Sequence, residues 1–468
     1  MKKQKRSTLV YFLLLFCTIG FAQVHSTDGR KVFGKALESI NSTNGLVRCV
    51  SSEYEKYLQE TVPNRATSEE FEAWLAPKVA AVKAQMRSSN GVTTVITIPV
   101  VVHVIHNGDA IGADENISDA QILSQITVLN QDFRRMLNTP GYNSNAIGAD
   151  IEIEFCMAQR SPAGTATNGI DRVNLGVASW ASETSVESTL KATTSWDPTQ
   201  YFNIWICKFS SSPSADLYGT LGYAQFPSNT GLGGLATNGG SANTDGVVID
   251  YRAFGSSTYA AGSYYTDYDK GRTATHEIGH CFGLIHIWGD TSSCTVNASD
   301  SFQDYCLDTP AASDANYDCA SVYNSCTVAA GNDMTENYMD YTNDTCMNTF
   351  TLDQKARILA VLQYGTRRSS LATSTACQST LGSETFDKLK GMSVYPNPVN
   401  DLLNITIDDS GILPETFTVY NTMGQLVLSK KVQSASDLSI DASLLNSGVY
   451  IVRLEKEGAV KTLKFLKK

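Results

Sequence analysis

The spacing of hydrophobic residues changes along the chain, and each change predicts a different element. Residues 94–106, TVITIPVVVHVIH, form a β-branched run that predicts a buried strand. Residues 118–136 predict a helix capped by Ser118, with apolar side chains on one face at Ile122, Ile126, Leu129 and Phe133. Further strands are predicted at residues 151–158, 201–209, 221–227 and 246–254. Because helix and strand alternate, the pattern favours an α/β sheet domain.

The segments before and after this region have different patterns of hydrophobic and polar residues. Residues 23–90 are polar and contain a helical pattern at 68–86, with Ser68 at its start. Residues 371–390 lack a strong period and are interpreted as a linker. From residue 391 to residue 468, short alternating strands are separated by Pro-Asn-Pro, Met-Gly and Ser-Gly turns. This spacing is typical of a small all-β sandwich.

Residues 1–22 have the features of a secretory signal peptide. Basic residues come first, the apolar run LVYFLLLF follows, and Gly20 and Ala22 stand at the spacing that signal peptidase accepts. The apolar run is too short to span a bilayer comfortably, and no later segment reaches that length. We therefore expect an exported protein with no transmembrane segment.

Net charge and cysteine usage narrow the class of protein further. The formal charge is −11, and no basic patch offsets it, which argues against a nucleic-acid partner. Of the 11 cysteines, six lie between Cys281 and Cys346. In an exported chain this clustering predicts disulfide bonds.

Residues 276–286, HEIGHCFGLIH, contain three of the 6 histidines of the chain. His276 and His280 are four residues apart, so a helix places them on one face, where both can bind one cation. Glu277 lies at the flank of that face and can reach a water molecule at the metal. At Gly283 the chain can leave the helix in a left-handed conformation, which brings His286 to the same ion.

Three neutral imidazoles leave the fourth position of a zinc ion open for water, as in catalytic zinc sites. The alternative for these residues is a set of ordinary histidines on an amphipathic helix. His103 and His106 fall on opposite faces of one predicted strand and are interpreted as structural residues. The motif therefore predicts a hydrolase that uses a metal-activated water.

The histidine motif, the later NYMDY at residues 337–341 and the segment from GDTSSC to CMNTFT resemble metzincin metallopeptidases of the pappalysin-like family. The resemblance covers about residues 94–365. It implies an α/β metzincin catalytic domain with a twisted, mostly parallel sheet and an active-site helix. It also implies a zinc-dependent endopeptidase, made as a latent precursor, in which His276, His280 and His286 bind Zn²⁺.

The same resemblance assigns roles to further residues. Glu277 would take a proton from water and pass it to the leaving amine, and Tyr341 would donate a hydrogen bond to the oxyanion. Met339 would form an apolar floor beneath the zinc. The alternatives are plain core packing for Met339 and an exposed loop position for Tyr341. A peptide substrate is expected to lie along the predicted strand at residues 221–227 by β-augmentation.

The C-terminal segments YPNPVND, NTMGQ and LNSGVYIVRL are similar to the sorting domain that directs cargo through type IX secretion machinery. The resemblance implies export beyond the outer membrane, either into the medium or onto the cell surface. The expected organisation is a signal peptide (1–22), a pro-segment (23–90), a catalytic domain (91–370), a linker (371–390) and a β-sandwich sorting domain (391–468).

The cysteine framework of the pappalysin-like family matches four positions here, which implies the disulfides Cys294–Cys326 and Cys319–Cys346. The sequence by itself allows three pairings of four cysteines. Cys281 and Cys306 depart from the family pattern. They are interpreted as a third disulfide, with a buried free thiol at Cys281 as the alternative.

The family resemblance also suggests further ligands. Cys49, in GLVRCVSSE, is similar to a cysteine switch, whose thiolate occupies the open zinc position; the alternative is an unpaired or disulfide-linked cysteine. Asp304 and Asp308 are expected to bind Ca²⁺, and the alternative is a solvated acidic loop. Asp344 is a candidate partner for a basic substrate residue just after the scissile bond, or else an ordinary loop aspartate.

Two other functions are compatible with the sequence. A secreted binding or adhesin module could retain the zinc site as a relic, since sorting domains occur on unrelated cargoes. Glu277 and Tyr341 argue against this alternative, because an inactive site has no chemical need for either. A zinc hydrolase of a non-peptide amide is the second alternative. An extended substrate strand favours protein or peptide substrates.

Overall fold

We describe the protein from a computed structural model. The described residues are 29–63, 65–88, 94–227, 242–319, 322–378, 389, 391–407, 413–456 and 459–468. The expected signal peptide lies outside these residues, and so do residues 379–388 of the expected linker.

A six-stranded sheet organises the middle of the chain, in the order β4-β3-β6-β8-β7 with β5 also paired to β3. Its strands are β3 (Ile96–His106), β4 (Ile153–Met157), β5 (Ile170–Asn174), β6 (Phe202–Cys207), β7 (Gly222–Ala224) and β8 (Gly246–Asp250). All pairs are parallel except β7 with β8. The structure confirms the predicted strands and adds β5, whose sequence IDRVN has no apolar alternation.

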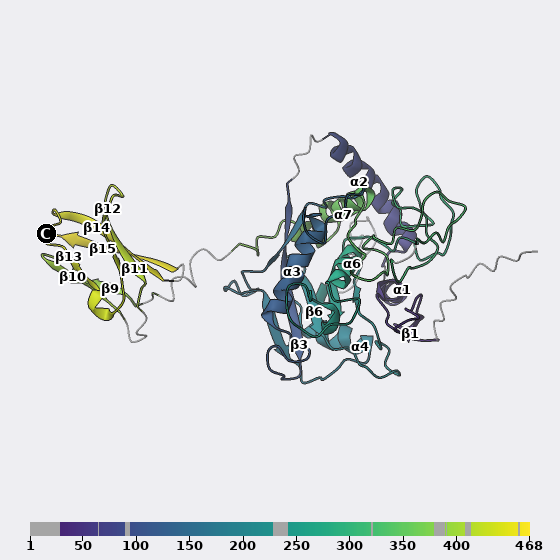
Figure 1. Cartoon of the computed structure of the whole chain (residues 1–468), viewed down its shortest axis with the longest axis horizontal. Helices are drawn as coiled ribbons and strands as arrows, with labels where there is room; N and C mark the ends of the chain where they lie inside the picture. The colour runs from purple at the N-terminus through teal and green to yellow at the C-terminus, as the bar shows by residue number, and fades with distance from the viewer. Residues whose placement is uncertain are drawn as a thin grey trace, which may run out of the picture.

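Two helices pack on one face of this sheet and form the main core with it (Figure 1). Helix α3 (Asp119–Phe133) begins as predicted at Ser118, whose side chain accepts a hydrogen bond from the backbone N–H of Gln121. Its four predicted apolar side chains are all buried in that core. Helix α6 (Arg272–Cys281) lies beside it against β7 and β8, and all of its residues are buried.

The opposite face of the sheet is covered by two separate parts of the chain. One is a continuous helical stretch made of α4 (Glu183–Ser185), the π-helix η1 (Val186–Lys191) and α5 (Ala192–Thr194). The other belongs to residues 29–88, which we call the N-terminal segment. Its apolar side chains, such as Phe33 and Tyr54, share a second core with Trp205, Tyr223 and Val248 of the sheet.

The N-terminal segment contains β1 (Lys31–Val32), β2 (Lys35–Ala36), α1 (Ser51–Thr61) and α2 (Ser68–Ser88). Just before α1, its backbone runs parallel to the edge of the sheet, since Val47 pairs with Thr220. The N–H of Val50 then donates to the carbonyl of Gly222 in β7 at 3.4 Å. Further along, α2 packs against α7 (Leu352–Tyr364), which is followed by the short helix α8 (Arg368–Leu371).

The C-terminal unit is a separate all-β structure with its own core, drawn in yellow in Figure 1. One antiparallel sheet has the order β13-β10-β9 and the other has the order β12-β11-β14-β15. The strands are β9 (Ser393–Tyr395), β10 (Leu402–Thr406), β11 (Thr416–Asn421), β12 (Leu426–Lys431), β13 (Ser439–Asp441), β14 (Gly448–Lys456) and β15 (Ala459–Lys467). This arrangement agrees with the predicted small sandwich.

Three disulfides link parts of the chain that are distant in sequence. The structure forms the two bonds implied by the family framework, Cys294–Cys326 and Cys319–Cys346. The third expected disulfide, Cys281–Cys306, is wrong: both thiols are free and buried, and the Sγ of Cys281 contacts the carbonyls of Gln225 and Gly246. Instead, Cys156 in β4 bonds to Cys377.

Among the described residues, no helix combines the length and the apolar character needed to cross a membrane.

The bond between Cys156 and Cys377 joins β4, at one edge of the sheet, to the residues that follow α8, across a sequence separation of 221 residues. We expect the double variant Cys156→Ser/Cys377→Ser to lose about 2–5 kcal/mol of stability, because the bond restricts the unfolded chain. Thermal unfolding of the purified protein should show a melting temperature roughly 5–15 °C lower. The single variant Cys156→Ser should match the double variant, and an unchanged melting temperature in both would contradict the expectation.

Candidate active site

Helix α6 carries His276, Glu277 and His280, and a sharp turn after it brings in His286. The helix ends at Cys281, and Gly283 follows with φ +89, the left-handed conformation predicted from the sequence. A side chain at Gly283 would also collide with Val361, since its Cβ would lie 2.8 Å from Cγ2. The turn therefore depends on glycine for two independent reasons.

The three imidazoles converge through their Nε2 atoms. The Nε2 of His280 lies 3.1 Å from that of His276 and 3.1 Å from that of His286. Each Nδ1 has another partner. The Nδ1 of His276 lies 2.7 Å from the carbonyl oxygen of Tyr338, and that of His280 lies 2.8 Å from the carbonyl oxygen of Leu284. The Nδ1 of His286 lies 2.7 Å from the carboxylate of Asp290. These bonds direct the Nε2 lone pairs to one point.

This arrangement fits a metal ion. Nitrogens at about 2.0–2.1 Å from a tetrahedral zinc ion would be about 3.3 Å apart, close to the separation found here. Burial and the positive charge that a neighbouring histidine would carry lower the pKa of His280 to about 3, so this imidazole is neutral. Burial also lowers the pKa of His276, whereas the Asp290 carboxylate raises that of His286. A metal cation is the natural partner for three buried nitrogens whose lone pairs point inward.

Glu277 faces the same point from the helix flank. Its Oε2 accepts a hydrogen bond from the Ser51 hydroxyl at 2.8 Å, whereas its Oε1 is buried and has no partner among the described residues. Burial raises the pKa of this carboxyl to about 7, although its hydrogen bonds to Ser51 and Cys49 oppose the shift. Such a carboxyl is suited to exchange protons near neutral pH.

The segment NYMDY forms a turn beneath the histidines. Met339 is fully buried, and a Cβ placed on Gly279 of α6 would lie only 2.6 Å from its Sδ, so the thioether packs directly under the helix. Tyr341 is also buried, and its ring centroid lies 4.9 Å from that of His286. Its hydroxyl donates to the backbone carbonyl of Cys49 at 3.3 Å.

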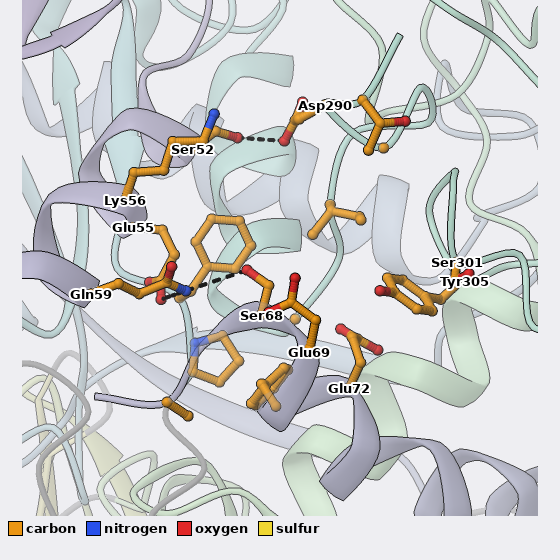
Figure 2. Close-up of a pocket in the computed structure, with 18 of the residues that line it drawn as sticks. Ser52, Glu55, Lys56, Gln59, Ser68, Glu69, Glu72, Asp290, Ser301 and Tyr305 are labelled. Atoms are coloured by element: carbon orange, nitrogen blue, oxygen red, sulfur yellow. Dashed lines mark hydrogen bonds between the residues drawn. The ribbon is translucent and has the colours of Figure 1, made fainter. Parts of the chain in front are cut away.

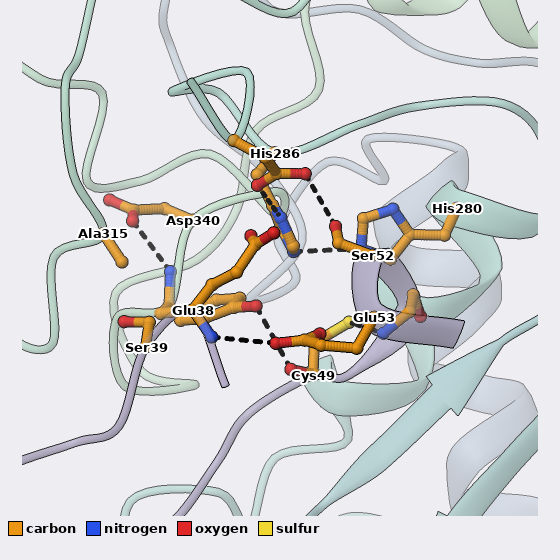
Figure 3. A network of polar contacts seen from close by, with 12 residues as sticks. Glu38, Ser39, Cys49, Ser52, Glu53, His280, His286, Ala315 and Asp340 are labelled. Carbon is orange, nitrogen blue, oxygen red and sulfur yellow. Dashed lines mark hydrogen bonds and ion pairs between the residues drawn. The ribbon is translucent and has the colours of Figure 1, made fainter. Parts of the chain in front are cut away.

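The N-terminal segment lies across this site (Figure 3). Cys49 Sγ and one nitrogen of each active-site histidine all lie within 4.8 Å of one another. Ser51 occupies the edge strand as well, because its hydroxyl accepts from the N–H of Ala224 in β7 at 2.8 Å. Ser52 donates to Asp290, the carboxylate that orients His286. The segment therefore adjoins both the converging histidine nitrogens and the edge strand β7.

Arg48, next to Cys49, fills a pocket formed around Asp344. Its guanidinium lies 2.9 Å from the Asp344 carboxylate and donates to the carbonyl of Thr342 at 3.0 Å, and both side chains of the ion pair are fully buried. The guanidinium also stacks on the ring of Tyr268 at 5.2 Å. Asp344 is fixed from behind by the backbone N–H groups of Lys270 and Arg272. The pocket is thus built for a cationic side chain.

Helices α1 and α2 of the N-terminal segment enclose a cavity of about 300 Å³ against the rest of the molecule (Figure 2). Its lining combines charged side chains such as Lys56 and Asp290 with apolar ones such as Phe226. The cavity thus borders Asp290, the carboxylate bonded to His286. At its far side Glu72 of α2 forms an ion pair with Arg357 of α7. The segment is therefore held at several points that do not involve the metal position.

The structure brings together most of the residues singled out from the sequence. The histidines, Glu277, Met339, Tyr341, Cys49 and Asp344 all lie within this site or contact it directly, whereas Asp304 and Asp308 lie in a separate loop. His103 is structural, as expected, with hydrogen bonds to Asp171 and Asn203. Sequence reasoning noted Arg48 beside Cys49 as part of the similarity to a cysteine switch but did not predict its contact with Asp344. It missed Ser51 and Asp290, although Asp290 stands four residues after His286.

Comparisons with known proteins agree with this geometry. The family described as "Pregnancy-associated plasma protein-A" matches residues 185–363, and the "Secretion system C-terminal sorting domain" matches residues 393–468. An extracellular metalloprotease of Arthroderma benhamiae is 31% identical over 300 residues, which cover 64% of this chain and 87% of that protein. Its counterpart from Pyricularia oryzae is 31% identical over 288 residues, covering 60% of this chain and 82% of that protein.

A solved structure is also similar. A promirolysin variant from Tannerella forsythia is 36% identical, covers 69% of this chain and 96% of its own, and superposes with a TM-score of 0.53. That protein is a precursor form, in agreement with a segment that lies across the active site. The chain therefore belongs to the pappalysin-like family of metzincin metallopeptidases, as a secreted or cell-surface metalloendopeptidase that is made as a precursor and carries a C-terminal secretion sorting domain.

Proposed function

We propose that the catalytic metal is a single Zn²⁺ bound by His276, His280 and His286. The convergence of three Nε2 atoms whose Nδ1 partners are all fixed is the observation that carries this proposal. Three imidazoles and one exchangeable position are the ligand set of catalytic zinc. A relic site in an adhesin would not need a buried general base or a phenol beside the histidines, and this chain has both.

Peptide hydrolysis follows from the residues around that position. Zinc, when bound, would polarise the scissile carbonyl and lower the pKa of water towards neutrality. Glu277 takes the proton of the attacking water at its carboxylate and delivers it to the leaving amine. Tyr341 donates its phenolic hydrogen to the oxyanion, and its present bond to the carbonyl of Cys49 supports this role because a substrate carbonyl would approach similarly.

Replacing Glu277 with alanine should abolish turnover while the zinc remains bound, because this carboxylate is not among the three ligands. We expect kcat to fall by at least about 10³-fold, whereas zinc content measured by atomic absorption should stay near one per chain. Glu154→Ala, at the opposite edge of the sheet, is the matched control and should retain wild-type activity. Retained turnover in Glu277→Ala would exclude this mechanism.

We also propose that residues 23–90 form the pro-segment and that Cys49 is a switch whose thiolate takes the fourth zinc position. Its neighbours support this role. Arg48 occupies the Asp344 pocket. The Ser51 hydroxyl donates a hydrogen bond to Glu277 and accepts one from the backbone N–H of Ala224 in β7. The remaining boundaries that we propose are 1–22 for the signal peptide, 91–370 for the catalytic domain, 371–390 for the linker and 391–468 for the sorting domain, which would engage type IX secretion machinery.

Cys49→Ala should give a precursor that activates more readily, because the thiolate no longer competes with water at the zinc. The lag before full activity of the purified precursor should shorten by several fold in a peptide-cleavage assay. Thr61→Ala, at the exposed end of α1, serves as the control and should keep the wild-type lag. A Cys49→Ala precursor as latent as the wild type would count against the switch.

We propose that the Asp344 pocket selects a basic residue just after the scissile bond. Arg48 supports this, since it is a fully buried cation that forms an ion pair with the Asp344 carboxylate. A charged pair of this kind contributes about 2–4 kcal/mol when both groups are desolvated. The physiological substrates would then be proteins or peptides with accessible arginine or lysine residues.

Asp344→Asn should remove the preference for a basic residue while preserving the shape of the pocket. For peptides that differ only in Arg or Leu after the scissile bond, the ratio of kcat/KM should fall by roughly 30- to 1000-fold. The Leu peptide provides the control, because its kcat/KM should change little in the variant. An unchanged Arg-to-Leu ratio would disprove the role of Asp344.

A calcium ion at Asp304 and Asp308 completes the proposal. One carboxylate oxygen of each residue is buried without a partner among the described residues, and Asp300 contributes a third such oxygen. Burial and the nearby Asp300 raise the pKa of Asp304 well above its usual range. Buried carboxylate oxygens that lack donors are the hard ligands that Ca²⁺ prefers.

A further inference from the structure

The side chains that surround Tyr54 form a pocket distinct from the Asp344 pocket, on the sheet face that points away from the histidines. Its walls come from the π-helix η1 and from strands β6 and β7. Lys191 is fully buried, and its Nζ pairs with Glu187 at 2.6 Å and lies 4.4 Å from the ring centroid of Tyr223. The ring centroid of Trp205 lies 5.4 Å from the same ammonium. The Tyr223 hydroxyl donates to Glu187 at 2.7 Å.

In the present structure Tyr54 of the N-terminal segment fills this pocket. It is 1% exposed, and its hydroxyl donates to the second oxygen of Glu187 at 2.5 Å. Its ring meets that of Tyr223 edge-on at 5.4 Å and lies 5.3 Å from the Lys191 ammonium. Phe33 of the N-terminal segment also contacts the Tyr54 ring, at 4.6 Å. Outside that segment, the pocket supplies the Tyr223 ring, the Lys191 ammonium near the ring and the Glu187 carboxylate for the phenol.

The pocket is only one strand away from the catalytic base. A Cβ on Gly222 would lie 3.3 Å from the Cγ of Glu277, whereas the next side chain, that of Tyr223, points to the opposite face. A peptide paired with β7 presents alternate side chains to these two faces. Some of its side chains therefore point towards the histidines and others towards Tyr223 and Glu187.

The order of residues along the N-terminal segment indicates on which side of the scissile bond this pocket would lie. Arg48 lies in the Asp344 pocket, Cys49 at the histidines, Ser51 on Ala224 and Tyr54 beyond, all along the direction of β7. If a basic substrate residue follows the scissile bond and enters the Asp344 pocket, the residues before the bond extend towards Tyr54. Removal of the N-terminal segment takes Tyr54 away but leaves Glu187, Lys191 and Tyr223.

We propose that this pocket is a subsite of the mature enzyme that takes a tyrosine side chain of the substrate, on the amino-terminal side of the scissile bond. The inference rests on the proposed function. A tyrosine gains both the ring contacts and a hydrogen bond to the Glu187 carboxylate. Phenylalanine keeps the ring contacts alone, and alanine keeps neither, so the expected order is tyrosine, then phenylalanine, then alanine.

The test uses the mature, zinc-loaded wild-type enzyme and peptides with arginine after the scissile bond. Tyrosine, phenylalanine or alanine is placed in turn at each of the second, third and fourth positions before the bond. At one position kcat/KM should be roughly 10- to 100-fold higher for tyrosine than for alanine, with phenylalanine between them. Absence of any such preference at all three positions overturns the proposal without involving a variant.

Two matched variants then assign the preference to the pocket. Glu187→Gln should reduce the tyrosine-to-phenylalanine ratio of kcat/KM by at least about threefold. Glu183→Gln alters a carboxylate four residues earlier that binds the backbone N–H of Phe33 at 2.9 Å instead, and it should keep the wild-type ratio. A ratio that Glu187→Gln does not change overturns the assignment.

Other outcomes separate the subsite from the proposed function. Failure of the zinc-loaded enzyme to cleave any peptide would contradict the proposed function, whereas cleavage without a tyrosine preference would contradict only the subsite. A synthetic peptide of residues 47–61 provides a further arm. If it inhibits through Tyr54 while substrates show no tyrosine preference, the pocket serves only the N-terminal segment and the proposal is wrong.

Discussion

The structure depends on holding three buried imidazoles with their Nε2 atoms directed at one point. This arrangement is unfavourable without a cation, because inward lone pairs repel one another in an apolar interior. The protein enforces this arrangement through one hydrogen bond at each Nδ1. Those of His276 and His280 are bonded to backbone carbonyls, and that of His286 is bonded to Asp290. The left-handed turn at Gly283 and the Met339 floor complete the support. Metal affinity is thereby built into the fold before any metal arrives.

The N-terminal segment uses the same groups that would recognise a substrate. Val50 and Ser51 form hydrogen bonds to the edge strand β7, and Arg48 fills the Asp344 pocket. The backbone carbonyl of Cys49 accepts a hydrogen bond from the Tyr341 hydroxyl. The backbone of the segment runs parallel to the sheet edge at Thr220. A peptide whose basic residue entered the Asp344 pocket just after the scissile bond, and whose preceding residues extended towards Tyr54, would run in the opposite direction. A chain in reversed orientation can fill recognition pockets without presenting a scissile bond in the geometry needed for hydrolysis.

Strand β7 connects the catalytic chemistry to a second, independent surface. Because successive side chains alternate, Gly222 leaves room for Glu277 on one face while Tyr223 joins Glu187 and Lys191 on the other. Only a small residue at Gly222 allows helix α6 to approach the edge strand so closely. The π-helix η1 on the far face places Glu187 and Lys191 side by side, in keeping with the frequent association of such helices with binding sites.

The sequence by itself determined the local elements and the grouping of the three histidines with Glu277. The strands, the Ser118 cap and HEIGHCFGLIH depend on short spacings that one helix or strand converts directly into geometry. Only the tertiary structure decided the contacts between distant segments. Arg48 reaches Asp344, Ser51 reaches Glu277, Tyr54 reaches Glu187, and Cys156 bonds to Cys377 in place of the expected Cys281–Cys306 pair. No local period encodes such pairs, since they arise when the N-terminal segment and the sheet bury their apolar faces together.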